Sequence, residues 1–229
     1  MKKTLVALAV AAALMPSLAM AEAGDIVVRV RATHIAPDES SSLGATTTAN
    51  LGGGTADALY GSRTAELRVD SNTIPEIDFS YYITKNIAAE LILAIGTRHD
   101  VKTTADAAHH PDLGSVNLLP PTLTAQWHFN PDQTFDPYIG AGVSYVRAMD
   151  NSLSWNGAVP IRISRNSFGP AIQAGFDYNL ENKWLLNFDV KKIWFDTKVE
   201  ANASGTTWTK IDQLDVDPWV VSVGFGRKF

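Results

Sequence analysis

The chain has 229 residues, and its 19 lysines and arginines against 24 aspartates and glutamates give a formal net charge of −5. This acidic balance argues against a nucleic-acid-binding surface, so no nucleic-acid partner is expected. The sequence has no cysteine, so burial or insertion into a bilayer must hold the fold without disulfides.

The first 21 residues are predicted to be a cleavable signal peptide. Lys2 and Lys3 precede an apolar run over residues 5–14, and Ala19-Met20-Ala21 forms a small-residue cleavage site. The apolar run is too short to span a bilayer as a helix, which needs roughly 20 residues. An uncleaved N-terminal anchor is the alternative, but the cleavage site argues against it. Residues 22–229 are expected to form one mature domain.

Eight segments of this mature part alternate apolar with polar or small residues, which is the period of a β-strand. In the last segment, for example, Trp219, Val221, Val223 and Phe225 share one face. A mean hydropathy of −0.03 does not reveal such strands, because alternation conceals their apolar residues from an average. The predicted strands cover residues 26–33, 76–83, 87–95, 122–129, 139–145, 171–180, 184–195 and 219–229.

The connections between these segments alternate between short and long. Short turns are predicted at 85–86, 130–134 and 181–183, and longer polar or glycine-rich connections at 37–72, 97–117, 148–166 and 197–210. This alternation is typical of an outer-membrane barrel with its short turns in the periplasm. The first long connection, which contains Gly52-Gly53-Gly54, is interpreted as a mobile extracellular loop.

A soluble β-sandwich would also alternate, and it is the competing interpretation. The aromatic residues favour the membrane, because they gather at strand ends, where the interfacial girdles of a barrel lie. A sheet in hydrocarbon must pair every strand and leave no edge. We therefore predict an all-β protein, an eight-stranded antiparallel transmembrane β-barrel of the Gram-negative outer membrane, surrounded by outer-membrane lipid and monomeric because it has no free edge.

Charged residues occur on the inward face of the predicted strands. Eight strands enclose room only for side chains or one small ligand, and isolated buried ions are strongly unfavourable. These residues are therefore predicted to form a salt-bridged plug in the lower, periplasmic half of the lumen. A catalytic acid–base pair and a polar ion pathway are the alternatives. The predicted plug residues are Arg29, Arg31, Glu76, Asp78, Glu90, Asp177, Asp189 and Lys191.

Three motifs give the chain a family resemblance. They are Leu119-Pro120-Pro121-Thr122-Leu123 followed by Gln126-Trp127, then Pro137-Tyr138-Ile139-Gly140-Ala141-Gly142, and finally Val216-Asp217-Pro218-Trp219 leading to the terminal Phe229. With these motifs in the same order along nearly the whole mature chain, the sequence resembles the outer membrane protein W family, which includes alkane-uptake proteins.

The resemblance implies a hydrophobic pocket in the upper lumen, closed below, that takes up small apolar molecules and releases them sideways into the membrane. It places the constriction of the lumen at Ile92 and Phe168. The alternation puts Ile92 inward, whereas Phe168 reaches the lumen only if a bulge near Gly169-Pro170 shifts the register. Ile193 and Phe195 are further pocket candidates.

Two prolines bear on the sideways route. Pro120 and Pro170 cannot donate to a strand ladder, so each is expected to mark a local break in pairing. Such a break would serve as a lateral opening, or it would simply be a strand end without a role in transport.

The C-terminal strand resembles the signal read by the barrel-assembly machinery, since it alternates and ends on the aromatic Phe229. Arg227 departs from the aromatic or apolar residue that is usual two places before the end. The assembly machinery is therefore an expected partner.

No enzyme, cofactor or metal is expected. His109 and His110, with Asp106 and Asp112, could coordinate a metal, but histidines in a loop are more often merely exposed. No G-x-S-x-G or Walker-type motif is present. The alternatives to uptake of hydrophobic molecules are a structural or adhesive barrel that acts through its loops and a narrow channel for small polar solutes.

Overall fold

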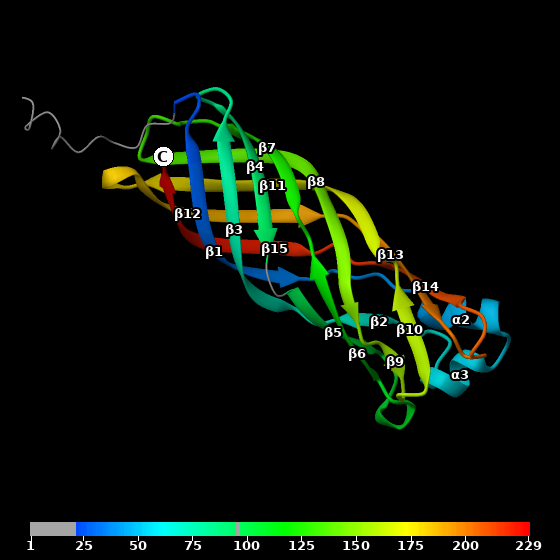
Figure 1. Ribbon diagram of the computed structural model, residues 1–229. Helices are drawn as coiled ribbons and strands as arrows, with labels where there is room; N and C mark the ends of the chain where they lie inside the picture. Colours follow the sequence, from blue (N-terminus) through cyan, green and yellow to red (C-terminus); the bar gives the residue numbers. More distant parts are fainter. Residues whose placement is uncertain (1–21, 95–96) are drawn as a thin grey trace, which may run out of the picture.

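The computed structural model describes residues 22–94 and 97–229, and these fold as a closed barrel of eight antiparallel strands (Figure 1). The barrel closes because β1 pairs with both β15 and β3, and β11 pairs with both β8 and β12. The predicted fold class is thereby confirmed, while the predicted signal peptide lies outside the described residues. The barrel strands are β1 (Ile26–Ala36), β3 (Asn72–Tyr82), β4 (Ile87–Ala94), β7 (Thr122–His128), β8 (Phe135–Asn151), β11 (Asn166–Asn179), β12 (Trp184–Ile193) and β15 (Trp219–Lys228).

The outer surface of the barrel is an apolar belt. Outward side chains such as Leu123, Ile139 and Val223 are more than half exposed. Trp184 lies on this surface at the end of the short turns, and Trp219 lies at the opposite end of the strands. An apolar band between aromatic residues matches the hydrocarbon layer and its two interfaces. Among the described residues, no helix is long and apolar enough to cross a bilayer.

The short turns lie at the end of the barrel where the described chain begins and ends, which is at the upper left of Figure 1. We call this end the lower end, in the sense of the expected orientation in the membrane. There the turn between β11 and β12 contains the 3-10 helix η2 (Glu181–Lys183). At the opposite, upper end, the sheet continues beyond the apolar belt. The upper strands are β2 (Leu67–Val69), β5 (Thr97–Thr103), β6 (Asp112–Leu119), β9 (Ser154–Trp155), β10 (Val159–Ile163), β13 (Asp196–Ala201) and β14 (Thr209–Asp215).

The long connections are therefore folded, and the prediction of a mobile loop at residues 37–72 is wrong. That segment forms the helices α2 (Leu43–Leu51) and α3 (Thr55–Tyr60), which Gly52-Gly53-Gly54 joins and which are followed by β2. The physical reason is burial: Leu43, Tyr60 and Leu67 belong to one apolar cluster that fills the upper end of the barrel. The 3-10 helix η1 (Ala107–His109) lies in the connection between β5 and β6.

The interior of the barrel has two layers. Going up each strand, the inward residues change from charged or polar to apolar: Glu90 precedes Ile92 on β4, and Lys191 precedes Ile193 on β12. All four side chains are buried. Strand alternation thus continues to direct side chains into the lumen, while the chemistry of those side chains changes with height. This change divides the lumen into a charged lower part and an apolar upper part.

Candidate functional site: an apolar lumen above a charged plug

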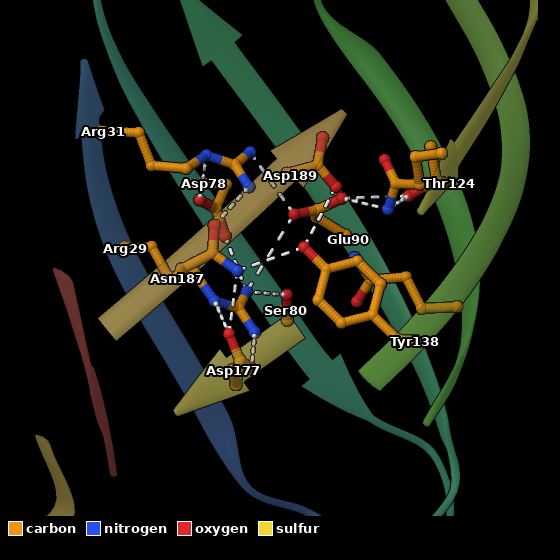
Figure 2. Close-up of polar contacts among 12 residues, drawn as sticks. Arg29, Arg31, Asp78, Ser80, Glu90, Thr124, Tyr138, Asp177, Asn187 and Asp189 are labelled. Atoms are coloured by element: carbon orange, nitrogen blue, oxygen red, sulfur yellow. Dashed lines mark hydrogen bonds and ion pairs between the residues drawn. The ribbon is translucent and has the colours of Figure 1, made fainter. Parts of the chain in front are cut away.

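Arg29 lies at the centre of the lower lumen (Figure 2). Its Nη1 is 2.8 Å from Asp78 Oδ1 on the neighbouring β3, and its Nη2 is 2.6 Å from Asp177 Oδ2 on β11. Nη1 also donates a hydrogen bond to Ser80 Oγ at 2.7 Å. Arg29 and Asp78 are fully buried, so the guanidinium exchanges its water shell for fixed oxygen acceptors.

Arg31, the next inward residue on β1, extends the ion-pair network upward. Its Nε lies 2.7 Å from Glu76 Oε1 and 3.1 Å from Asp78 Oδ2, and its Nη2 lies 3.4 Å from Glu90 Oε1. Asp78 therefore bridges the two arginines. Because Glu90 is also 3.9 Å from Arg29, each arginine faces several carboxylates.

Side chains from β8 and β12 complete the network (Figure 2). Lys191 Nζ is 2.8 Å from Asp189 Oδ1, and the Tyr138 hydroxyl donates to Asp189 Oδ2 at 3.0 Å. Tyr138 has room because Gly175 lacks a side chain: a Cβ there would lie 2.6 Å from the Tyr138 hydroxyl oxygen. All eight residues of the predicted plug thus take part in the ion pairs described here.

A buried group below the plug was not recognised from the sequence. His128 Nδ1 lies 2.7 Å from Asp136 Oδ2, and the His128 and Tyr82 rings are 5.0 Å apart. All three side chains are buried. The inward parity of His128 and Asp136 was the available signal, but the contact between them depends on the pairing of β7 with β8.

Above the plug, the lumen contains two adjoining apolar cavities of about 50 Å³ each. A cavity of this size has room for only a few water-sized groups, so an apolar guest must be slender or displace side chains. The upper cavity is lined by residues that include Leu67, Val101, Leu113, Ile161 and Val199. The lower cavity is lined by residues that include Ile35, Thr97, His99, Pro120 and Val220. Both are lined by Val69, Leu118, Val146, Phe195 and Val216.

The predicted gate and pocket residues lie at different places in this arrangement. Phe195 lines both cavities, and Pro120 lines the lower one. Ile92 and Ile193 are buried directly above Glu90 and Lys191, and neither is among the residues that line the two cavities. These two side chains therefore belong to the boundary between the plug and the cavities.

The prediction that Phe168 lies in the lumen is wrong. Its side chain is 67% exposed on the outer wall, where its ring stacks on Tyr145 at a centroid distance of 4.7 Å. Phe168 pairs in register with Tyr145 of β8, and the buried Gly169 takes the inward position instead. No bulge shifts β11 at this point, so Phe168 keeps the outward parity of its strand.

The two prolines that were expected to break the strand pairing differ from each other in the structure. At Pro170, β11 remains paired with β8, and the Pro170 carbonyl accepts a hydrogen bond from Trp194 N at 3.0 Å, so the expected interruption is absent. At Pro120, the β4–β7 ladder ends at the pair Ile92 and Thr122, and the β5–β6 ladder begins at Thr97 and Leu118. Pro120 and Pro121 lie between these ladders without an N–H to donate.

The two loop histidines make local contacts. His109 Nδ1 is 2.6 Å from Asp106 Oδ1, and the His110 ring packs edge-on against Trp155. His109 lowers the pKa of Asp106 through this hydrogen bond. Within the described ranges, no group of three or more histidine, aspartate or glutamate side chains is arranged to hold a metal ion.

A closed antiparallel barrel with a lipid-facing apolar belt and a paired, charged interior defines a β-barrel protein of the outer membrane. The model of the OmpW family matches residues 22–229, and the chain belongs to this family.

Known proteins agree with this assignment. The chain is 33% identical to outer membrane protein W of Escherichia coli, over 100% of this chain and 99% of that protein. It is similar to the crystal structure of OprG from Pseudomonas aeruginosa, with a TM-score of 0.78 and 31% identity over 93% of this chain and 99% of that one. Outer membrane protein AlkL of Ectopseudomonas oleovorans is 28% identical over 79% of this chain and 74% of that protein.

Proposed function

We propose that the protein mediates passive uptake of small hydrophobic molecules across the outer leaflet of the outer membrane. The observation that carries this proposal is the layering of the lumen, in which apolar cavities lie above a buried ion-pair network. Apolar molecules gain from leaving water for such a lumen. Moving on into a layer of fixed charges would bring these molecules no such gain in free energy.

The plug favours a sideways exit. A solute that crossed the barrel along its axis would have to separate Arg29 from Asp177 and Arg31 from Glu76, which are buried pairs with contacts of 2.6 and 2.7 Å. Removing one partner from a buried charge is strongly unfavourable. The same network argues against a narrow channel for polar solutes, because it leaves the lower lumen filled by its own side chains.

We place the exit beside Pro120. This residue lines the lower cavity, and neither it nor the adjacent Pro121 has an N–H to donate to a neighbouring strand. The outward neighbours Leu119 and Leu123 are exposed on the wall, so a molecule that passed here would meet an apolar surface. Pro170 is not part of this proposal, since the strands around it are paired.

The test uses two arginine substitutions on the same strand. Val146 on β8 lines both cavities, whereas Met149, three residues further along, is 53% exposed on the outer wall. Val146→Arg is expected to abolish uptake of a radiolabelled alkane by cells that produce the protein. Met149→Arg is the matched control and should retain it. Heat-modifiable migration in electrophoresis checks that both variants are folded.

Unchanged uptake with Val146→Arg would reject the proposal. A phenotype that is lost only when the upper loops are altered would instead support a structural or adhesive barrel. Conductance across a planar bilayer, persisting with no apolar ligand present, would support a channel for polar solutes.

The remaining partners follow from the same proposal. The ligands are small hydrophobic molecules, and their uptake involves no catalysis. The barrel acts as a monomer, because closure leaves no strand edge to pair with another chain. The barrel-assembly machinery reads the last strand, which ends at Lys228 and is followed by the exposed Phe229.

A further inference from the structure

We propose that His99 selects, among slender apolar molecules, those that carry a hydroxyl group, such as alcohols and phenols. This inference rests on the proposed uptake function and names the substrate class of the same lumen. It comes from one polar side chain in an otherwise apolar cavity.

His99 lies on β5 and is only 4% exposed, yet it lines the lower cavity. Among the described residues that line this cavity, the one other side chain with a polar group is Thr97, the preceding inward residue of the same strand. The remaining lining residues are aliphatic, aromatic or proline. A guest that enters this cavity therefore meets its hydrogen-bonding groups on a single strand.

The hydrogen bond that His99 makes determines what its other nitrogen offers. Nδ1 lies 2.9 Å from the backbone carbonyl oxygen of Asp70. A carbonyl oxygen can only accept, so Nδ1 carries the proton, and in the neutral ring Nε2 is an acceptor. In the part of the chain that the structure describes, Nε2 has no hydrogen-bond partner.

Thr97 offers the same chemistry. Its hydroxyl donates to the backbone carbonyl of Leu118, which leaves only lone pairs for a guest. Both polar groups of the lower cavity thus accept hydrogen bonds. A guest with an O–H group satisfies one of them, whereas an ether, ester or ketone adds an acceptor that has no donor to meet.

The upper cavity does not impose this selection. Its lining includes Ser164, whose Oγ accepts from Lys198 N and so keeps its own proton to donate, and Thr197, whose hydroxyl has no partner among the described residues. The preference is therefore specific to the lower cavity, next to the proposed exit at Pro120. An unpaired polar group in an apolar site is unfavourable enough to change affinity about tenfold.

The experiment compares three guests with the same number of heavy atoms: nonane, a primary octanol and methyl heptyl ether. Uptake of each radiolabelled compound is measured at low concentration in cells that produce the full-length chain. Octanol is expected to enter about tenfold faster than the ether. His99→Leu should remove this preference, measured as the ratio of octanol to ether uptake within the variant, while His99→Gln, whose side chain can still accept, should retain most of it.

The outcomes separate the two proposals. If the preference for octanol persists in folded His99→Leu, the role of His99 is overturned while uptake of apolar molecules stands. If nonane uptake does not exceed that of cells without the protein, the proposed function itself fails. A loss of nonane uptake in both His99 variants would assign His99 a structural role and would also overturn the inference.

Discussion

Arg29 and Asp177 are 148 residues apart in sequence, yet two hydrogen bonds join them across the lumen, from Nη2 to Oδ2 at 2.6 Å and from Nε to Oδ1 at 3.2 Å. Their strands β1 and β11 are separated by β12 and β15 on one side of the wall. Such a two-pronged contact between a guanidinium and a carboxylate fixes both distance and orientation. It links two strands that are not neighbours in the barrel wall and closes the lumen below the cavities.

The first prediction concerns this contact. Arg29→Met leaves Asp78 and Asp177 buried without their main partner, and the free energy of unfolding should fall by about 3–5 kcal/mol. Urea unfolding in lipid vesicles, followed by tryptophan fluorescence, measures the change. The control is Arg63→Met, which removes an exposed pair with Asp57 and should change stability by less than about 1 kcal/mol. Equal effects of the two substitutions would contradict the prediction.

The second prediction concerns the wall at Pro120. Pro120→Thr supplies an N–H to the strand and favours continued pairing with β4, so uptake of a radiolabelled alkane should fall severalfold in a fully folded barrel. Pro170→Thr is the matched control, because Pro170 already lies within a paired wall. Uptake that stays at the original level with Pro120→Thr would place the exit elsewhere.

The third prediction concerns pH at the upper end. Glu200 on β13 accepts hydrogen bonds from Lys198 Nζ at 2.5 Å and Arg162 Nε at 2.8 Å, and these hold its pKa below its ordinary value of 4.5. A lowered pKa in the folded state means that folding favours the ionised carboxyl. This stabilisation is present above the ordinary pKa and is lost as the pH falls through the folded-state pKa.

Carboxyl carbon NMR shifts, recorded through a pH titration, measure the pKa of Glu200 directly. In a protein carrying both Lys198→Met and Arg162→Met, the Glu200 pKa should rise toward its ordinary value. An unchanged pKa in that double variant would show that the two hydrogen bonds are not its cause.

The fourth prediction concerns assembly. Phe229→Ala should reduce the amount of protein in the outer membrane severalfold, because the aromatic terminus is part of the proposed assembly signal. Folding of the purified chain into lipid vesicles should be nearly unchanged, since Phe229 is 62% exposed at the barrel end. Phe135→Ala, an exposed aromatic residue on β8 at the same end, is the control. Equal losses for both variants would indicate a general effect of removing surface aromatics.

The number of strands and the polarity of the lumen could be read from the sequence because both are local properties. Alternation with a period of two shows, strand by strand, which side chains share a face. The opposite parity of Arg29, Asp177 and Lys191 to the lipid-facing residues was sufficient to place these charges inside. The family motifs then indicated the kind of barrel.

Only the tertiary structure decided which of these side chains meet and where each connection lies. The contact between Arg29 and Asp177 depends on the stagger of strands far apart in the chain, and the outward position of Phe168 depends on an unshifted register with β8. His99 lies in a segment that appeared to be a polar loop, and it lines the lumen because β5 pairs with β6 above the belt. Periodicity fixes the face of a residue within its own strand, but the height and partner of that residue in a barrel come from pairing between strands.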